Sequence, residues 1–187
     1  MNLARRLSTF CYRLVSVRVW LGTVVVFGLF LVLVLPAVSE QTRTITGTHE
    51  TPDTSFWYSP ADLYRLAELY GPEGRAYYVR SRFTFDLVWP LVYLSFLAAS
   101  LTLLYRAQRP NGLRLANAIP FAAVVFDLFE NVSVSWIMVR FPAEAAFAAS
   151  LAPLFTTTKW LFIGLSFAFL VWGLILQVKP KTELTGK

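Results

Sequence analysis

Between Arg18 and Glu40 the chain carries no charged side chain, and apolar residues dominate this stretch. Its length matches the roughly 20 residues that an α-helix needs to cross the hydrocarbon core of a bilayer. Three more apolar stretches follow, so we place membrane spans at about 17–38, 84–105, 115–139 and 153–178. These stretches predict an all-α protein, namely an integral membrane four-helix transmembrane bundle.

The charge content agrees with this class of protein. Charged residues make up 15% of the 187 residues, whereas about a quarter is usual in a soluble domain. One sizeable loop, at about 39–83, two short connections and two short tails lie outside the spans, so we expect a single membrane domain over residues 1–187. Cys11 is the only cysteine, which excludes an intramolecular disulfide and the CxxC chemistry of quinone-linked thiol oxidoreductases.

The net charge of +6 does not indicate a nucleic-acid partner, because Lys and Arg cluster at the ends of the apolar stretches. There they act as topology signals and contact phospholipid head groups. Basic residues lie in both tails and between the second and third spans, which predicts cytoplasmic N- and C-termini. Together with the short connections this favours the bacterial cytoplasmic membrane, with a eukaryotic endomembrane as the alternative. The expected partners are the lipid bilayer and either another membrane protein or a second copy of the chain.

The loop at about 39–83 is expected on the outer side of the membrane. Its first part, residues 41–47, is polar and β-prone. Ser59 and Pro60 then form an N-cap and first helical position, and Gly71 followed by Pro72 ends that helix. A second short helix leads from Pro72 into the second span. Tyr, Trp and Arg alternate along this region, which predicts amphipathic helices that cap the bundle in the outer head-group region.

Polar residues inside the predicted spans are the most informative feature of the sequence, because each costs several kcal/mol in an apolar setting unless it is paired or hydrated. They are Asp86, Asp127, Glu130, Asn131 and Lys159. In the third span the polar residues are spaced by three and four, so they share one helix face. Similar stripes run along the second span, from Asp86 through Tyr93 to Ser100, and along the fourth, from Thr156 through Lys159 to Gln177.

These stripes predict a buried polar site in the outer half of the bundle, open toward the outer leaflet. Three carboxylates face one lysine, so either Arg75 or Arg82 reaches in, or a proton or a cationic ligand balances the charge. The predicted function is binding of a lipid-like or cationic amphipathic molecule. The expected ligand-binding residues are Asp86, Tyr93, Asp127, Glu130, Asn131, Lys159 and Arg75. If the protein is an enzyme, Asp86, Asp127 and Glu130 are the candidates for proton transfer.

Other functions fit the same residues. The polar side chains can simply hold helices together in a structural or assembly subunit of a larger membrane complex. A proton- or ion-coupled transporter is a third possibility, although four spans are few and no inverted repeat is visible. A divalent cation is also conceivable, since carboxylates and Asn131 are oxygen ligands, but Lys159 argues against it.

Cofactor motifs do not narrow the choice. The sequence has no nucleotide fingerprint, no Gly-rich phosphate loop, no HExxH or GxSxG motif, and no haem or thiol redox motif. His49, with Glu50 and Asp53 nearby, is a weak candidate for a metal site, because a single loop histidine is more often solvated.

One further pattern runs from the loop to the fourth span and comprises residues 69–75, Tyr78, Asp86, Pro90, Tyr93, Asp127, Glu130, Asn131 and Lys159. In this pattern the chain resembles small, uncharacterised bacterial four-helix membrane proteins, a resemblance that implies no activity. The architecture is also similar to that of the sterol-isomerase-like four-helix superfamily, whose cavity carries acidic residues facing a lipid-like ligand. Those isomerases use an intramembrane histidine, and the predicted spans here contain none, so sterol isomerisation is not implied.

Overall fold

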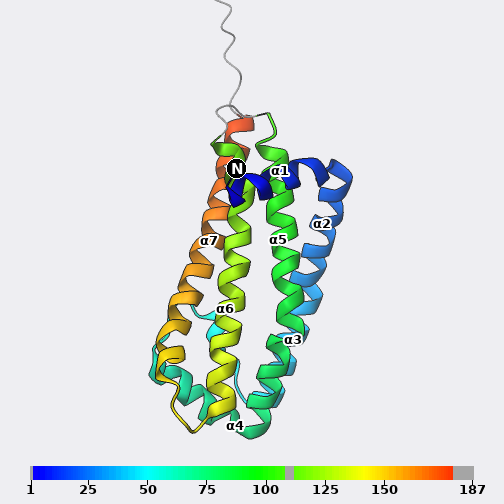
Figure 1. Cartoon of the computed structure of the whole chain (residues 1–187). Coiled ribbons are helices and arrows are strands. Elements are labelled where there is room, and N and C mark those ends of the chain that lie inside the picture. Colours follow the sequence, from blue (N-terminus) through cyan, green and yellow to red (C-terminus); the bar gives the residue numbers. More distant parts are fainter. Residues whose placement is uncertain (1, 108–111, 179–187) are drawn as a thin grey trace, which may run out of the picture.

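The computed structural model describes residues 2–107 and 112–178. Within these ranges the chain is all-helical and has four helices long and apolar enough to cross a membrane. Figure 1 shows them side by side as an elongated bundle. They are formed by α2 (Val17–Leu29) continuing through a π-helical turn (Phe30–Val34) into α3 (Leu35–Thr46), by α5 (Phe85–Leu104), by α6 (Ile119–Arg140) and by α7 (Ala146–Val178). The predicted all-α class with four long apolar helices is confirmed.

The two ends of the bundle differ in what covers them. At the end of the bundle where α7 ends, the amphipathic helix α1 (Leu3–Leu14) lies across the bundle (Figure 1). It contacts the 3₁₀-helix Leu113–Ala118, where the Ser8 hydroxyl donates to the carbonyl oxygen of Arg114 at 3.0 Å. At the opposite end α4 (Pro60–Arg82) covers the bundle (Figure 1).

The start and the break of α4 follow the sequence signals. Ser59 is the N-cap, and its side chain accepts from the backbone N–H of Asp62 while Asp62 accepts from the N–H of Ser59. Gly71 interrupts the helix with φ 61° and ψ 179°, a backbone conformation that favours glycine, and Pro72 follows. The predicted capped start at Ser59–Pro60 and the interruption at Gly71 are therefore confirmed.

The composition of residues 41–47 favours an extended conformation, but the structure is helical there, because the first long helix continues to Thr46. The threonine hydroxyls of this turn donate to carbonyl oxygens four residues earlier, as Thr42 does to Val38 at 2.8 Å. Glu40 and Arg43 form an ion pair along the helix, and α3 packs against α4. Gly47 then ends the helix in the left-handed conformation, with φ 76°. Local pairing and tertiary packing thus override the β-propensity of threonine.

The polar stripes of the second and third spans face the interior, as predicted. On α5 the buried positions include Asp86, Tyr93 and Ser100, and on α6 they include Asp127 and Glu130. On α7 the stripe is buried at Thr156, Lys159, Ser166 and Gly173, whereas Gln177 is exposed.

The first long helix packs on α5 along α2 and on α4 along α3. Its Phe27 ring stacks on Phe96 with ring centroids 4.2 Å apart, and Phe30 stacks on Trp89 at 6.0 Å. The indole of Trp20 donates to the Ser100 hydroxyl at 3.0 Å. By contrast, α6 and α7 pack closely along their length. These contacts leave room for a cavity between the first long helix, α5 and α7.

Candidate functional site: a charged cavity at the α4 end of the bundle

Lys159 forms a buried three-charge cluster with two carboxylates of the neighbouring helix. Its ammonium lies 3.1 Å from Asp127 Oδ1 and in even closer contact with Glu130 Oε2. Asp127 and Glu130 stand one turn apart on α6, so their side chains project from one face toward α7. All three side chains are at least nine-tenths buried. We call Asp127, Lys159 and Glu130 the lysine triad.

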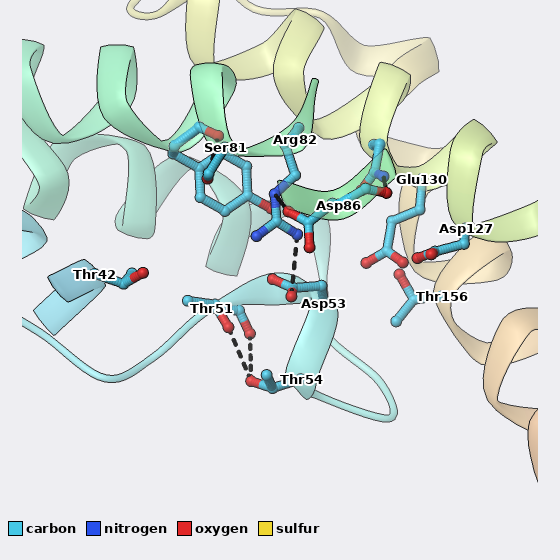
Figure 2. Close-up of polar contacts among 12 residues, drawn as sticks. Thr42, Thr51, Asp53, Thr54, Ser81, Arg82, Asp86, Asp127, Glu130 and Thr156 are labelled. Atoms are coloured by element: carbon cyan, nitrogen blue, oxygen red, sulfur yellow. Dashed lines mark hydrogen bonds and ion pairs between the residues drawn. The ribbon is translucent and has the colours of Figure 1, made fainter. Parts of the chain in front are cut away.

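Arg82 forms a second cluster with two other carboxylates. Arg82 is the last residue of α4, and its Nη1 lies 3.0 Å from Asp53 Oδ2, as Figure 2 shows. Its Nε lies 2.8 Å from Asp86 Oδ2, one turn further along the chain at the start of α5. The guanidinium also lies over the Tyr78 ring, 4.5 Å from its centroid. We call Asp53, Arg82 and Asp86 the arginine triad.

The two triads are connected through the loop between α3 and α4. The carbonyl oxygen of Asp53 accepts from Lys159 Nζ at 3.4 Å and from the Trp160 indole at 3.3 Å. On the other side, the Asn131 amide donates to the carbonyl oxygen of Asp86 at 3.5 Å. Asp53 thus enters the end of the bundle from a loop and contacts residues of α4 and α7. Figure 2 shows it below Arg82 and close to Asp86.

A cavity of about 540 Å³ adjoins both triads. One part of its wall is polar and consists of Asp53, Thr54, Arg82, Asp86, Tyr93, Asp127 and Lys159. The remainder is apolar and largely aromatic, consisting of Phe27, Leu31, Leu35, Phe85, Trp89, Leu97, Trp160, Ile163 and Phe167. Cavities of this size with a few convergent polar groups are typical small-molecule sites.

The formal charges of the two triads do not cancel. Each triad places one cation between two carboxylates, so four acids face two bases when all are ionised. Burial by itself raises the pKa of Asp53, but the positive charges of Arg82 and Lys159 outweigh this and hold the pKa below its ordinary value. Asp53 is therefore ionised at neutral pH.

Most of the predicted binding residues come together here. Asp86, Tyr93, Asp127 and Lys159 line the cavity, and the Tyr93 hydroxyl lies 3.5 Å from Asp127 Oδ2. Glu130 and Asn131 are buried behind this wall, at 1% and 2% exposure. Among the catalytic candidates, Asp86 and Asp127 thus line the cavity and Glu130 contacts Lys159 from behind.

Arg75 does not join the site, although it was expected at its edge. Its guanidinium donates to the carbonyl oxygen of Ala67 at 2.7 Å and lies over the Phe141 ring. The physical reason is the break at Gly71–Pro72, which leaves carbonyl groups of the preceding turn without helical donors. Arg82, the alternative arginine, occupies the site instead.

Among the charged residues of the site, Asp53 is the one that sequence reasoning did not select. Its sequence context suggested only a weak metal site with His49 and Glu50. The structure separates Glu50 from Asp53, because Glu50 pairs with the exposed Arg65 at 2.7 Å while Asp53 turns inward to Arg82. Among the described residues, no group of three His, Cys, Asp or Glu side chains is arranged to hold a metal ion.

No protein-family model matches this chain, and no curated protein or solved structure does.

Proposed function

We propose that this chain is an integral protein of the bacterial cytoplasmic membrane that binds a lipid-like amphiphile in the cavity between its first long helix, α5 and α7. The observation that carries the proposal is the two-part wall of the cavity. Charged and hydroxyl groups gather at one part, and aromatic and aliphatic side chains cover the other. An amphiphile has the same division, so its head group would lie beside Asp86 and its chain beside Ile163.

The cavity opens on the flank of the bundle, which supports access from the bilayer. Leu31 on the first long helix and Phe167 on α7 both line the cavity, yet 46% and 41% of their surfaces are exposed. Residues that face both a cavity and the outer surface mark its opening. In the proposed membrane orientation that opening faces lipid, so an amphiphile would reach the cavity laterally without crossing water.

The orientation follows from the two ends of the molecule. Helix α1 and the end of α7 lie at one end, where basic residues such as Arg5, Arg106 and Arg114 also occur. The positive-inside rule assigns this end to the cytoplasm. The triads lie at the α4 end, so the head group of the ligand would sit toward the outer leaflet.

The proposal is tested by native mass spectrometry of the protein released from mild detergent, with two tryptophan variants. Ile163→Trp fills the cavity, and Leu161→Trp places the same side chain on the exposed face of α7, where Leu161 is 59% exposed. We expect a bound amphiphile in the wild type and in Leu161→Trp, and none in Ile163→Trp.

An unliganded mass for all three proteins, with folding intact, would contradict the proposal. The triads would then serve to hold the helices together, as in a structural subunit of a larger complex. Retention of the amphiphile in Ile163→Trp would contradict it as well, because binding would then lie outside the cavity.

A further inference from the structure

We infer that the head group of the bound amphiphile is a primary ammonium, which binds beside Asp53, Asp86 and Asp127. This inference rests on the proposed function and adds the chemical class of the ligand. Three observations carry it: the distribution of charge in the triads, the hydrogen-bond acceptors that lack donors, and the position of both beside the cavity.

The charge distribution disfavours an anionic head group. Arg82 and Lys159 are the two cations at the cavity, and each already lies between two carboxylates. A phosphate or carboxylate bound to either cation would bring a third negative charge next to it, in a site whose acids already outnumber its bases. A cationic head group instead compensates this excess of acids over bases.

The hydrogen-bond acceptors add a requirement for N–H groups. Within the described part of the chain, buried oxygen atoms without a hydrogen-bond partner include Asp53 Oδ1, Asp86 Oδ2, Glu130 Oε1 and Asn131 Oδ1. The first two belong to residues that line the cavity, and Asp86 is only 7% exposed. Asp86 Oδ2 touches Arg82 Nε in an ion pair, but the two atoms are not aligned for a hydrogen bond.

A primary ammonium group fits this pattern better than the alternatives. It brings positive charge, three N–H donors and no acceptor. An alcohol donates one hydrogen bond but leaves the charge uncompensated. A quaternary ammonium compensates the charge and stacks on aromatic rings such as Trp89, but it has no N–H and leaves the carboxylate oxygens unpaired, which is costly in a buried site.

The closing experiment compares four amphiphiles with the same dodecyl chain on the delipidated, full-length protein in a non-ionic detergent. Dodecylamine, dodecyltrimethylammonium, dodecanol and dodecanoate are titrated by calorimetry at neutral pH. We expect dodecylamine to bind about tenfold or more tightly than each of the other three, because hydrogen bonds to charged groups are the strong ones. Asp86→Asn should reduce its affinity about tenfold.

Asp53→Asn provides a second variant, in case Asp86→Asn does not fold, and the same loss is expected. Glu50→Gln is the matched control, because Glu50 belongs to the same loop but pairs with Arg65 on the surface. Its affinity for dodecylamine should equal that of the wild type.

The possible outcomes separate the two proposals. Equal binding of all four amphiphiles overturns the ammonium assignment and leaves amphiphile binding standing. Equal binding of dodecylamine and dodecyltrimethylammonium overturns the role of the N–H donors, and tightest binding of dodecanoate overturns the charge argument. If none of the four binds, the proposed function itself fails.

Discussion

Asp53 and Arg82 join a loop to the end of a helix: Oδ2 of Asp53 lies 3.0 Å from Nη1 of Arg82. Arg82 is 7% exposed and the Asp53 side chain about one-fifth exposed, so the pair is largely removed from water. The backbone of the same aspartate accepts from Lys159 and Trp160 on α7. The position of the loop between α3 and α4 therefore depends on two charged side chains of the bundle.

Asp53→Asn should destabilise the protein at neutral pH by about 1.5–3 kcal/mol, the usual contribution of a hydrogen bond to a charged group. The replacement keeps the shape of the side chain and removes its charge, so Arg82 retains only Asp86 as a carboxylate partner. Thermal unfolding in detergent measures the loss. Glu50→Gln, in the exposed pair with Arg65, should leave the melting temperature unchanged. An equal effect of the two substitutions would show that the inward pair is not energetically important.

The effect of Asp53→Asn should also depend on pH. The pKa of Asp53 in the folded protein lies below its value in the unfolded chain, which is about 3.9. Its ion pair therefore contributes fully above the unfolded pKa, and the contribution is lost as the pH falls through the folded pKa. The difference in melting temperature between wild type and variant should be constant near neutral pH and shrink below about pH 4. A difference that grows toward acid pH would contradict the assignment.

Lys159→Met should be among the most destabilising single substitutions in the chain. It leaves Asp127 and Glu130 buried without their cation, and breaking a buried pair in this way typically costs about 3–5 kcal/mol. Adding Glu130→Gln should restore part of the lost stability, since one of the two buried acids that lack a cation is then neutral. The double-mutant cycle is measured by unfolding in mixed micelles. Wild-type stability of Lys159→Met would mean that the lysine triad does not hold α6 to α7.

The sequence predicted those parts of the site that follow from helical periodicity. Asp127, Glu130 and Asn131 are spaced by three and four on a long apolar helix, so their common face, and its burial, could be inferred directly. Lys159 and Asp86 could be inferred from their charge, because a charged side chain within an apolar stretch must face the bundle interior. Helices with strong periodicity thus identify buried groups before any tertiary contact is known.

The remainder of the site depends on loop geometry, which has no comparable periodicity. Asp53 lies in a short 3₁₀ turn, Pro52–Thr54, and nothing in its local sequence distinguishes it from the neighbouring Glu50, which points to the surface. Arg75 and Arg82 both follow the break in α4, and the choice between them depended on how the helix resumes after Gly71. Only the tertiary structure brings Asp53 and Arg82 together.

Gly173 should tolerate a large side chain poorly, because α5 passes close to it. A Cβ atom built at this position would lie 3.2 Å from Leu104 Cβ and 3.2 Å from Tyr105 Cζ. Gly173→Leu should therefore force the helices apart and cost about 1–3 kcal/mol. Gly164 lies on the same helix with nothing within 4 Å of such an atom, so Gly164→Leu is the matched control and should be neutral or slightly stabilising. Equal melting temperatures of the two variants would contradict this close approach of α5 and α7.

The proposed lateral opening predicts that joining its two edges will stop exchange of the ligand. Leu31 and Phe167 line the cavity from the first long helix and from α7, and both reach the outer surface. Leu31→Cys and Phe167→Cys are combined with Cys11→Ser, which removes the single native cysteine. A short, reducible bis-maleimide then bridges the two sites. Uptake and release of dodecylamine should slow at least tenfold in the bridged protein and recover when the bridge is reduced, whereas either single cysteine variant treated with the same reagent should exchange normally.

Unchanged exchange in the bridged protein would place the route elsewhere, for example past the loop that carries Asp53. Binding of the amphiphile would then be independent of access through the side of the bundle.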